Sequence, residues 1–94
     1  MKLVKTNFEM NVNESSSWIV YIAKNAEDAQ NIYNMCLTQK EIMNGWYYTV
    51  GMNKVCKDCR VPTFFHDREY WVVAVEHNNG DWNKKPTYTL YIAE

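Results

Sequence analysis

The stretch Tyr70-Trp71-Val72-Val73-Ala74-Val75 decides the fold, because it is apolar on both of the faces that alternate along an extended chain. A strand of this kind must be covered on both sides. The sequence supplies one convincing helix, from about residue 26 to residue 43, and a single helix can cover only one face of a sheet. The other face therefore needs a loop, a second copy of the chain or a different partner.

Three further segments have the patterns of strands. Residues 18–23 are also apolar on both faces, which predicts that they and residues 70–75 form the central strands. Residues 4–12 alternate apolar and polar side chains, which predicts a strand with one wet face that forms an antiparallel hairpin with residues 18–23. Residues 87–92 predict a last strand, in a second hairpin with residues 69–77.

The helix has a recognisable start and end. Asn25 is a good N-cap, because its side-chain oxygen can accept from the free N–H groups of the first turn, and Asn44-Gly45 allows a left-handed end. A strand over residues 46–50 follows, and residues 51–67, interrupted by Pro62, are irregular. The order β-β-α-β-β-β predicts an α+β fold, a mostly antiparallel sheet of about five strands with one helix packed on one face.

The composition describes an ordinary globular chain with many aromatic rings. Its 94 residues predict a single domain, 1–94, and they are 47% apolar and 22% charged. Four Trp, seven Tyr and three Phe can close a small core or serve as interface anchors. The net charge of -1 selects no partner, and the sequence shows neither an export signal nor a membrane span, so we expect a cytoplasmic protein.

Several kinds of chemistry have no motif here. The chain lacks the phosphate-binding and dinucleotide-binding glycine patterns and the H-E-x-x-H motif, and it has only three glycines. The pair His66-Asp67 follows Cys59 and would suit a nucleophile, a base and an orienting group, but such groups must be adjacent in space. We therefore predict a protein that is not an enzyme and needs no cofactor.

Cys56-Lys57-Asp58-Cys59 has the spacing of half a zinc site, because two thiolates three residues apart can reach one tetrahedral ion. His66 is the nearest further ligand. The same spacing suits a redox or disulfide pair, or two unpaired thiols. A thioredoxin-type role is disfavoured because no helix pattern follows Cys56.

The candidate partner-binding residues are aromatic or basic. Trp82 lies in a polar loop, where it either folds back over the sheet or serves as an exposed anchor. Residues 51–68 carry four basic and two acidic side chains, a local charge of +2. The candidates are Trp82, Trp71, Tyr91, Lys57, Arg60 and Arg68. Sheet aromatics beside Lys54, Lys57 and Arg60 would also suit single-stranded nucleic acid, although the total charge lacks the usual basic surplus.

In its size, its aromatic richness and its lack of catalytic motifs, the chain resembles the small proteins that phages and mobile elements encode to block a host complex, anti-CRISPR proteins among them. This resemblance implies a stoichiometric protein-binding module, an inhibitor or regulator. The binding surface would be an apolar sheet face or the irregular segment 51–68, and the chain itself would be a candidate homodimer. The alternatives are a nucleic-acid-binding module and a small redox or zinc protein.

Overall fold

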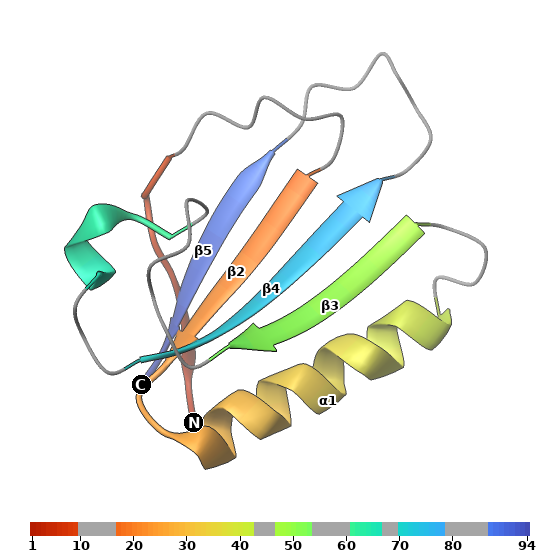
Figure 1. Ribbon diagram of the computed structural model, residues 1–94, viewed down its shortest axis with the longest axis horizontal. Coiled ribbons are helices and arrows are strands. Elements are labelled where there is room, and N and C mark those ends of the chain that lie inside the picture. The colour runs from red at the N-terminus through yellow and green to blue at the C-terminus, as the bar shows by residue number, and fades with distance from the viewer. Residues whose placement is uncertain (10–16, 43–46, 54–60, 67–69, 79–86) are drawn as a thin grey trace.

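The protein is α+β, with one helix packed on a sheet (Figure 1). The computed structural model describes residues 1–9, 17–42, 47–53, 61–66, 70–78 and 87–94. The elements in chain order are β1 (Leu3–Lys5), β2 (Ser17–Ala23), α1 (Ala26–Ile42), β3 (Tyr47–Asn53), the 3-10 helix η1 (Thr63–Phe65), β4 (Trp71–Asn78) and β5 (Tyr88–Ala93). The predicted fold class, with its helix and its sheet of five strands, is confirmed.

The strands lie side by side in the order β1-β5-β2-β4-β3. Strand β2 pairs with β5 in parallel, and the other three pairings are antiparallel, so the sheet is mixed but mostly antiparallel. Each of the two strands that are apolar on both faces, β2 and β4, has a neighbour on either side. Their prediction as central strands is therefore confirmed.

Both predicted hairpins are wrong. Strand β2 lies between β5 and β4, so those two strands do not pair with each other, and β1 pairs with β5 instead of β2. The chain ends hold this arrangement, since Lys2 N donates to Glu94 O and Glu94 N donates to Lys2 O, both at 2.8 Å. An alternating pattern identifies the face that a strand buries, but it does not identify the strand's neighbour.

The predicted bounds hold better for the helix than for the edge strands. Helix α1 begins after Asn25, whose Oδ1 accepts from Asp28 N at 2.8 Å, as expected for the cap. Strand β1 spans Leu3–Lys5 and so includes only residues 4 and 5 of the expected 4–12; residues 6–9 are not a strand, and residues 10–12 lie outside the described residues. Strand β3 continues to Asn53, beyond the expected end at residue 50.

The sheet separates two apolar clusters, one on each face. The helix-side cluster joins residues of α1 to inward residues of the sheet, namely Ala23, Ala29, Ile32, Cys36, Val73, Val75 and Ala93. The cluster on the opposite face, called here the second face, consists of Val20, Ile22, Val61, Phe65, Val72 and Leu90. Both faces of β2 and β4 therefore contribute buried apolar side chains, as their sequences require.

The two covers differ in kind and in position. Helix α1 packs over β2, β4 and β3. Val61, just before η1, and Phe65, in η1, cover the second face over β5, β2 and β4. Figure 1 shows η1 on the β5 side of the sheet, away from α1. Part of the irregular segment thus supplies the second cover that the sequence demands. Among the described residues, no helix has the length and apolar character needed to cross a membrane.

Candidate protein-binding surface

The short helix η1 is a rigid turn built from local contacts. Pro62 has φ -55° and ψ 143°, an extended start that its ring favours, and its carbonyl accepts from Phe65 N at 3.0 Å. His66 N donates to Thr63 O at 3.0 Å, and the His66 side-chain Nε2 lies 2.9 Å from Val61 O. These bonds fix the turn at both ends.

The turn directs two neighbouring rings in different directions. A 3-10 helix has three residues per turn, so consecutive side chains point about 120° apart. Phe65 points to the sheet and is 3% exposed, whereas Phe64 is 61% exposed. Their rings still touch edge to face, with centroids 5.1 Å apart. Phe64 is therefore held at the surface by a buried neighbour.

Phe65 is the centre of a ring cluster, called here the aromatic cap and consisting of Phe8, Phe64, Phe65 and Tyr70. The Phe65 centroid lies 5.6 Å from that of Phe8 and 5.9 Å from that of Tyr70, both in edge-to-face arrangements. Such arrangements are the favoured geometry of aromatic pairs and contribute beyond the area they bury. The cap thus joins Phe8, near the start of the chain, to rings between residues 64 and 70.

Phe8 reaches the cap because of the way in which β1 ends. Thr6 extends the pairing with β5, since its N–H donates to Leu90 O at 2.9 Å. Its hydroxyl also donates to Leu90 O at 3.0 Å and accepts from Phe8 N at 3.3 Å. This local turn after β1 directs the chain toward the second face, where Phe8 contacts Phe65.

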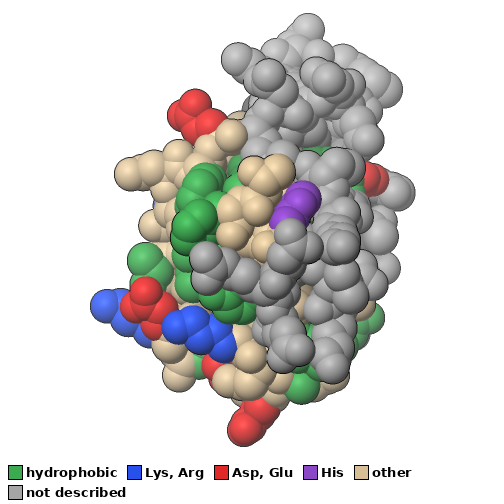
Figure 2. Space-filling model, turned by 60° about the vertical axis from the view of Figure 1, so that its left-hand side comes forward, with side chains coloured by type: hydrophobic (Ala, Val, Ile, Leu, Met, Phe, Trp, Pro, Cys, Tyr) green, Lys and Arg blue, Asp and Glu red, His purple; other side chains and the backbone are tan. Residues whose placement is uncertain are grey.

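The outer side of the cap is an exposed apolar surface. Phe8 is 39% exposed, so the rings of both Phe8 and Phe64 are accessible to solvent. Figure 2 shows a group of hydrophobic side chains on this face of the molecule, with Lys, Arg, Asp and Glu side chains toward its margin. Aromatic side chains on a rigid turn are typical anchors of protein interfaces, because they bury a large area with little loss of conformational entropy.

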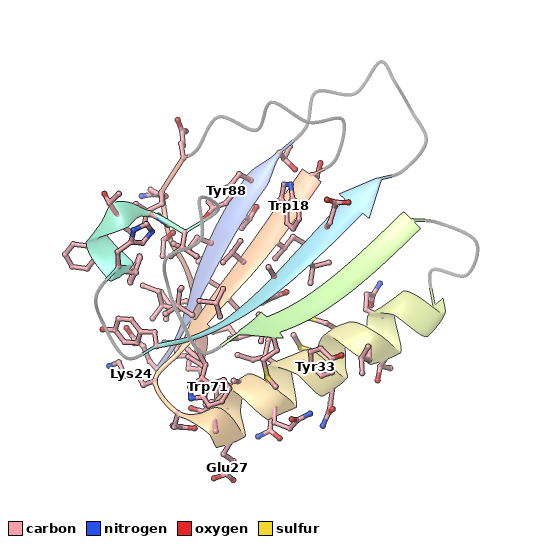
Figure 3. All side chains as sticks on the ribbon, in the orientation of Figure 1. Trp18, Lys24, Glu27, Tyr33, Trp71 and Tyr88 are labelled. Carbon is pink, nitrogen blue, oxygen red and sulfur yellow. The ribbon has the colours of Figure 1, made fainter. Side chains whose placement is uncertain are left out.

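Two of the predicted partner-binding residues, Trp71 and Tyr91, lie on the helix-side face of the sheet. Trp71 is half-buried beside the start of α1 and packs against the helix-side cluster (Figure 3). Tyr91 is half-buried and stacks on Tyr21, its partner in the adjacent strand, with centroids 5.2 Å apart and planes at 14°. Both rings therefore pack within the domain, away from the aromatic cap.

The other predicted partner-binding residues, Trp82, Lys57, Arg60 and Arg68, lie outside the described residues, as do Cys56 and Cys59. Of the predicted metal ligands, only His66 is described, and its Nε2 is engaged with Val61 O. A metal bound by this ring would have to use Nδ1. The described part of the chain contains no group of three or more His, Cys, Asp or Glu side chains that could hold a metal.

Cys36 is the free cysteine of the described residues; it belongs to α1 and is buried between the helix and the sheet. Burial raises the pKa of its thiol from 9.0 to about 11, and a hydrogen bond with the Tyr21 side chain lowers it in part. The thiol is therefore protonated at neutral pH. It is then neither a good nucleophile nor a good metal ligand, because both roles require the thiolate. Cys36 acts as a small apolar side chain of the core.

The sequence pattern alone does not single out Phe8 or Phe64. Phe8 lies in the alternating pattern of residues 4–12, which assigns it to an ordinary strand face. Phe64 lies in the segment treated as irregular. A signal was present in Pro62-Thr63-Phe64-Phe65, because two adjacent rings after a proline cannot both point into the same core.

Comparison of the chain with family models, curated proteins and solved structures finds no match.

Proposed function

We propose that this chain is a non-catalytic protein-binding module whose contact surface is the aromatic cap, with Phe64 as its central anchor. The observation that carries the proposal is the 61% exposure of Phe64 on a turn that is fixed on both sides. Full burial of a Phe side chain contributes about 1.5 to 3 kcal/mol, and a partner that covers Phe64 would gain the part of this free energy that the exposed ring area leaves.

The rigidity of the cap supports a binding role. The turn is closed by backbone bonds and by the His66 contact with Val61, and Phe65 anchors it on the sheet. A partner would therefore meet Phe64 in a nearly fixed position, which reduces the entropy lost on binding. We keep the prediction that a protein partner binds segment 51–68, because Phe64 lies in that segment.

The biological role we propose is that of a stoichiometric inhibitor or regulator of a host protein complex, similar in kind to anti-CRISPR proteins. The small single domain, its aromatic content and the resemblance in kind described above support this role. A near-neutral chain with a net charge of -1 suits a partner recognised by apolar contact more than one recognised by phosphate charge.

The test is affinity capture from a lysate of the organism that encodes the chain, with wild type and Phe64→Ala compared in parallel. We expect Phe64→Ala to weaken the affinity for the partner by about 30-fold or more, which is the usual effect of removing a central anchor. Met35→Ala is the matched control, because Met35 is also a large exposed apolar residue, at 46%, but lies on α1.

Three results would contradict the proposal. Equal recovery of the partner by wild type and Phe64→Ala would remove Phe64 from the interface. Equal losses in both variants would indicate nonspecific apolar adsorption. Recovery that disappears after nuclease treatment, with binding to an oligonucleotide that weakens steeply with salt, would favour the nucleic-acid alternative.

A further inference from the structure

The centre of the aromatic cap is closed to a partner. Phe65 is 3% exposed, and the rings of Phe8, Phe64 and Tyr70 contact it with centroid distances of 5.1 to 5.9 Å. Close-packed side chains of this kind leave few voids larger than a water molecule. A partner's side chain therefore cannot enter between these rings, and the contact has to be made with the side chains that the cap presents outward.

Phe64 is the most exposed ring of the cap, at 61% against 39% for Phe8. An aromatic side chain buries about 150 to 250 Å² when it is enclosed, so roughly 90 to 150 Å² of Phe64 remains for a partner. The side chain of Thr63, which precedes it in the turn, points about 120° away. Figure 1 shows η1 at the margin of the molecule, beside the sheet. Phe64 is therefore a convex feature that stands out from its surroundings.

On the basis of the proposed function, we infer that the partner is a folded protein with a preformed apolar pocket that encloses the Phe64 ring. A flat surface covers only one side of a ring that stands out in this way. The walls of a pocket cover the ring on several sides and exclude water around it. A folded domain supplies such walls, whereas an extended peptide does not.

The fixed position of Phe64 favours a pocket that exists before binding. The backbone N–H groups of Phe65 and His66 donate to Pro62 O and Thr63 O, both at 3.0 Å, and so hold the turn on either side of Phe64. The turn thus presents the ring from a nearly fixed backbone. A rigid group gains most from a rigid, complementary site, because neither loses much conformational entropy on binding.

The turn also indicates the chemistry of the pocket. Residues 61–66 have the sequence VPTFFH, without Asp, Glu, Lys or Arg, and the Phe64 side chain has no hydrogen-bonding group. A pocket that fits this ring is therefore lined by apolar and aromatic side chains, with no polar group at its base. Such a pocket discriminates against a ring with a hydroxyl, whose hydrogen bonds to water it cannot replace, and against a larger ring.

Substitutions that change the size of residue 64 test the pocket. The partner captured by wild type is purified and titrated with Phe64→Tyr, Phe64→Trp and Phe64→Leu, and thermal unfolding checks that each variant is folded. We expect Phe64→Tyr and Phe64→Trp to bind about tenfold or more weakly than wild type, and Phe64→Leu to bind better than either. A flat contact or base stacking predicts the reverse order, because larger rings then bury more area. Binding of Phe64→Trp that is as tight as that of wild type, or tighter, would overturn the inference.

Benzene provides a second measurement on the same complex. Phe64→Ala leaves the pocket empty, and a dry apolar cavity of this kind binds benzene. Benzene should therefore strengthen the binding of Phe64→Ala to the purified partner severalfold, while the binding of wild type and of Met35→Ala stays unchanged. Absence of this rescue would also overturn the inference, since no enclosed space would then be left by the missing ring. Equal binding of Phe64→Ala and wild type would instead contradict the proposed function itself, so the two failures are distinguishable.

Discussion

The two faces of the sheet are buried to the same degree by covers of very different kinds. On the helix side, a helix of 17 residues contributes Ala29, Ile32 and Cys36, all nearly inaccessible to solvent. On the second face, in the part of the chain that the structure describes, Val61 and Phe65 contribute side chains that are just as inaccessible. A cover therefore needs a few well-placed apolar side chains, and regular secondary structure is only one way of placing them.

Among the described residues, fewer side chains cover the second face than cover the helix side. Each apolar residue of α1 shares its role with neighbours on the same stripe, whereas Phe65 is at once the largest side chain of its cover and the centre of the aromatic cap. We therefore expect substitutions on the second face to lower the unfolding free energy more than substitutions on the helix side.

Phe65→Ala should have the largest effect, about 3 to 5 kcal/mol of unfolding free energy, because it removes a buried ring and three ring contacts. Urea unfolding measures this loss. For a domain of this size, whose total stability is about 5 to 15 kcal/mol, the variant would be marginal at room temperature. Phe65→Leu is the control, and it should recover a large part of the loss by filling the same space.

A loss below about 1 kcal/mol in Phe65→Ala would contradict the role of the η1 segment as the second cover. It would mean that residues other than Val61 and Phe65 keep water from Val20, Ile22 and Leu90.

Ile32→Ala should lower the unfolding free energy by about 2 to 5 kcal/mol, since Ile32 is fully buried between α1 and the sheet. Ile32→Val, which removes a single methylene, should lower it by about 0.5 to 1.5 kcal/mol. The two variants belong in the same urea series as Phe65→Ala. Should Ile32→Ala prove clearly more destabilising than Phe65→Ala, the helix would be the dominant cover.

The same contrast explains how far the sequence predicts this structure. Helix α1 is read correctly because its apolar stripe recurs at the helical period and Asn25 marks its start. Strands β2 and β4 are read correctly because they are apolar on both faces. Each of these signals is local, so it survives without knowledge of the neighbouring elements.

Neither the pairing partner of a strand nor an irregular segment that covers a sheet face produces a comparable pattern in the sequence. The pairing of β1 with β5 depends on contacts between the two chain ends, at Lys2 and Glu94. The aromatic cap depends on Phe8 meeting Phe65 after a turn made by Thr6. Both arrangements join residues far apart in sequence, and no periodic pattern encodes such contacts. The candidate surface therefore emerges only once the fold is known.

The pH dependence of the unfolding free energy tests whether Cys36 is buried in the helix-side cluster. Because burial raises the pKa of the folded thiol from 9.0 to about 11, the unfolded thiol loses its proton first as the pH rises. The unfolding free energy should be unaffected by Cys36 below about pH 9 and should fall between about pH 9 and 11, by up to about 2 to 3 kcal/mol. Urea unfolding at a series of pH values measures this.

Cys36→Ala is the reference for that series, since it lacks the thiol but keeps the other groups that titrate in the same range. The wild-type curve should fall more steeply than the variant curve above about pH 9. Parallel curves would show that the Cys36 thiol is accessible to water in the folded protein, and that the helix-side cluster is looser than its burial indicates.

We expect the smallest effect from removing the N-cap of α1. Asn25→Ala removes the Oδ1 acceptor of Asp28 N, at 2.8 Å, and the 3.3 Å contact between Asn25 Nδ2 and Asp28 Oδ2. We expect a loss of about 1 kcal/mol, or roughly 4 to 8 °C in Tm, measured by thermal unfolding. Asn25→Ser, which keeps an acceptor, should lose much less. A loss of this size would confirm that the Asn25 cap contributes to the stability of α1. Equal Tm values for Asn25→Ala and wild type would show that α1 is held by packing alone.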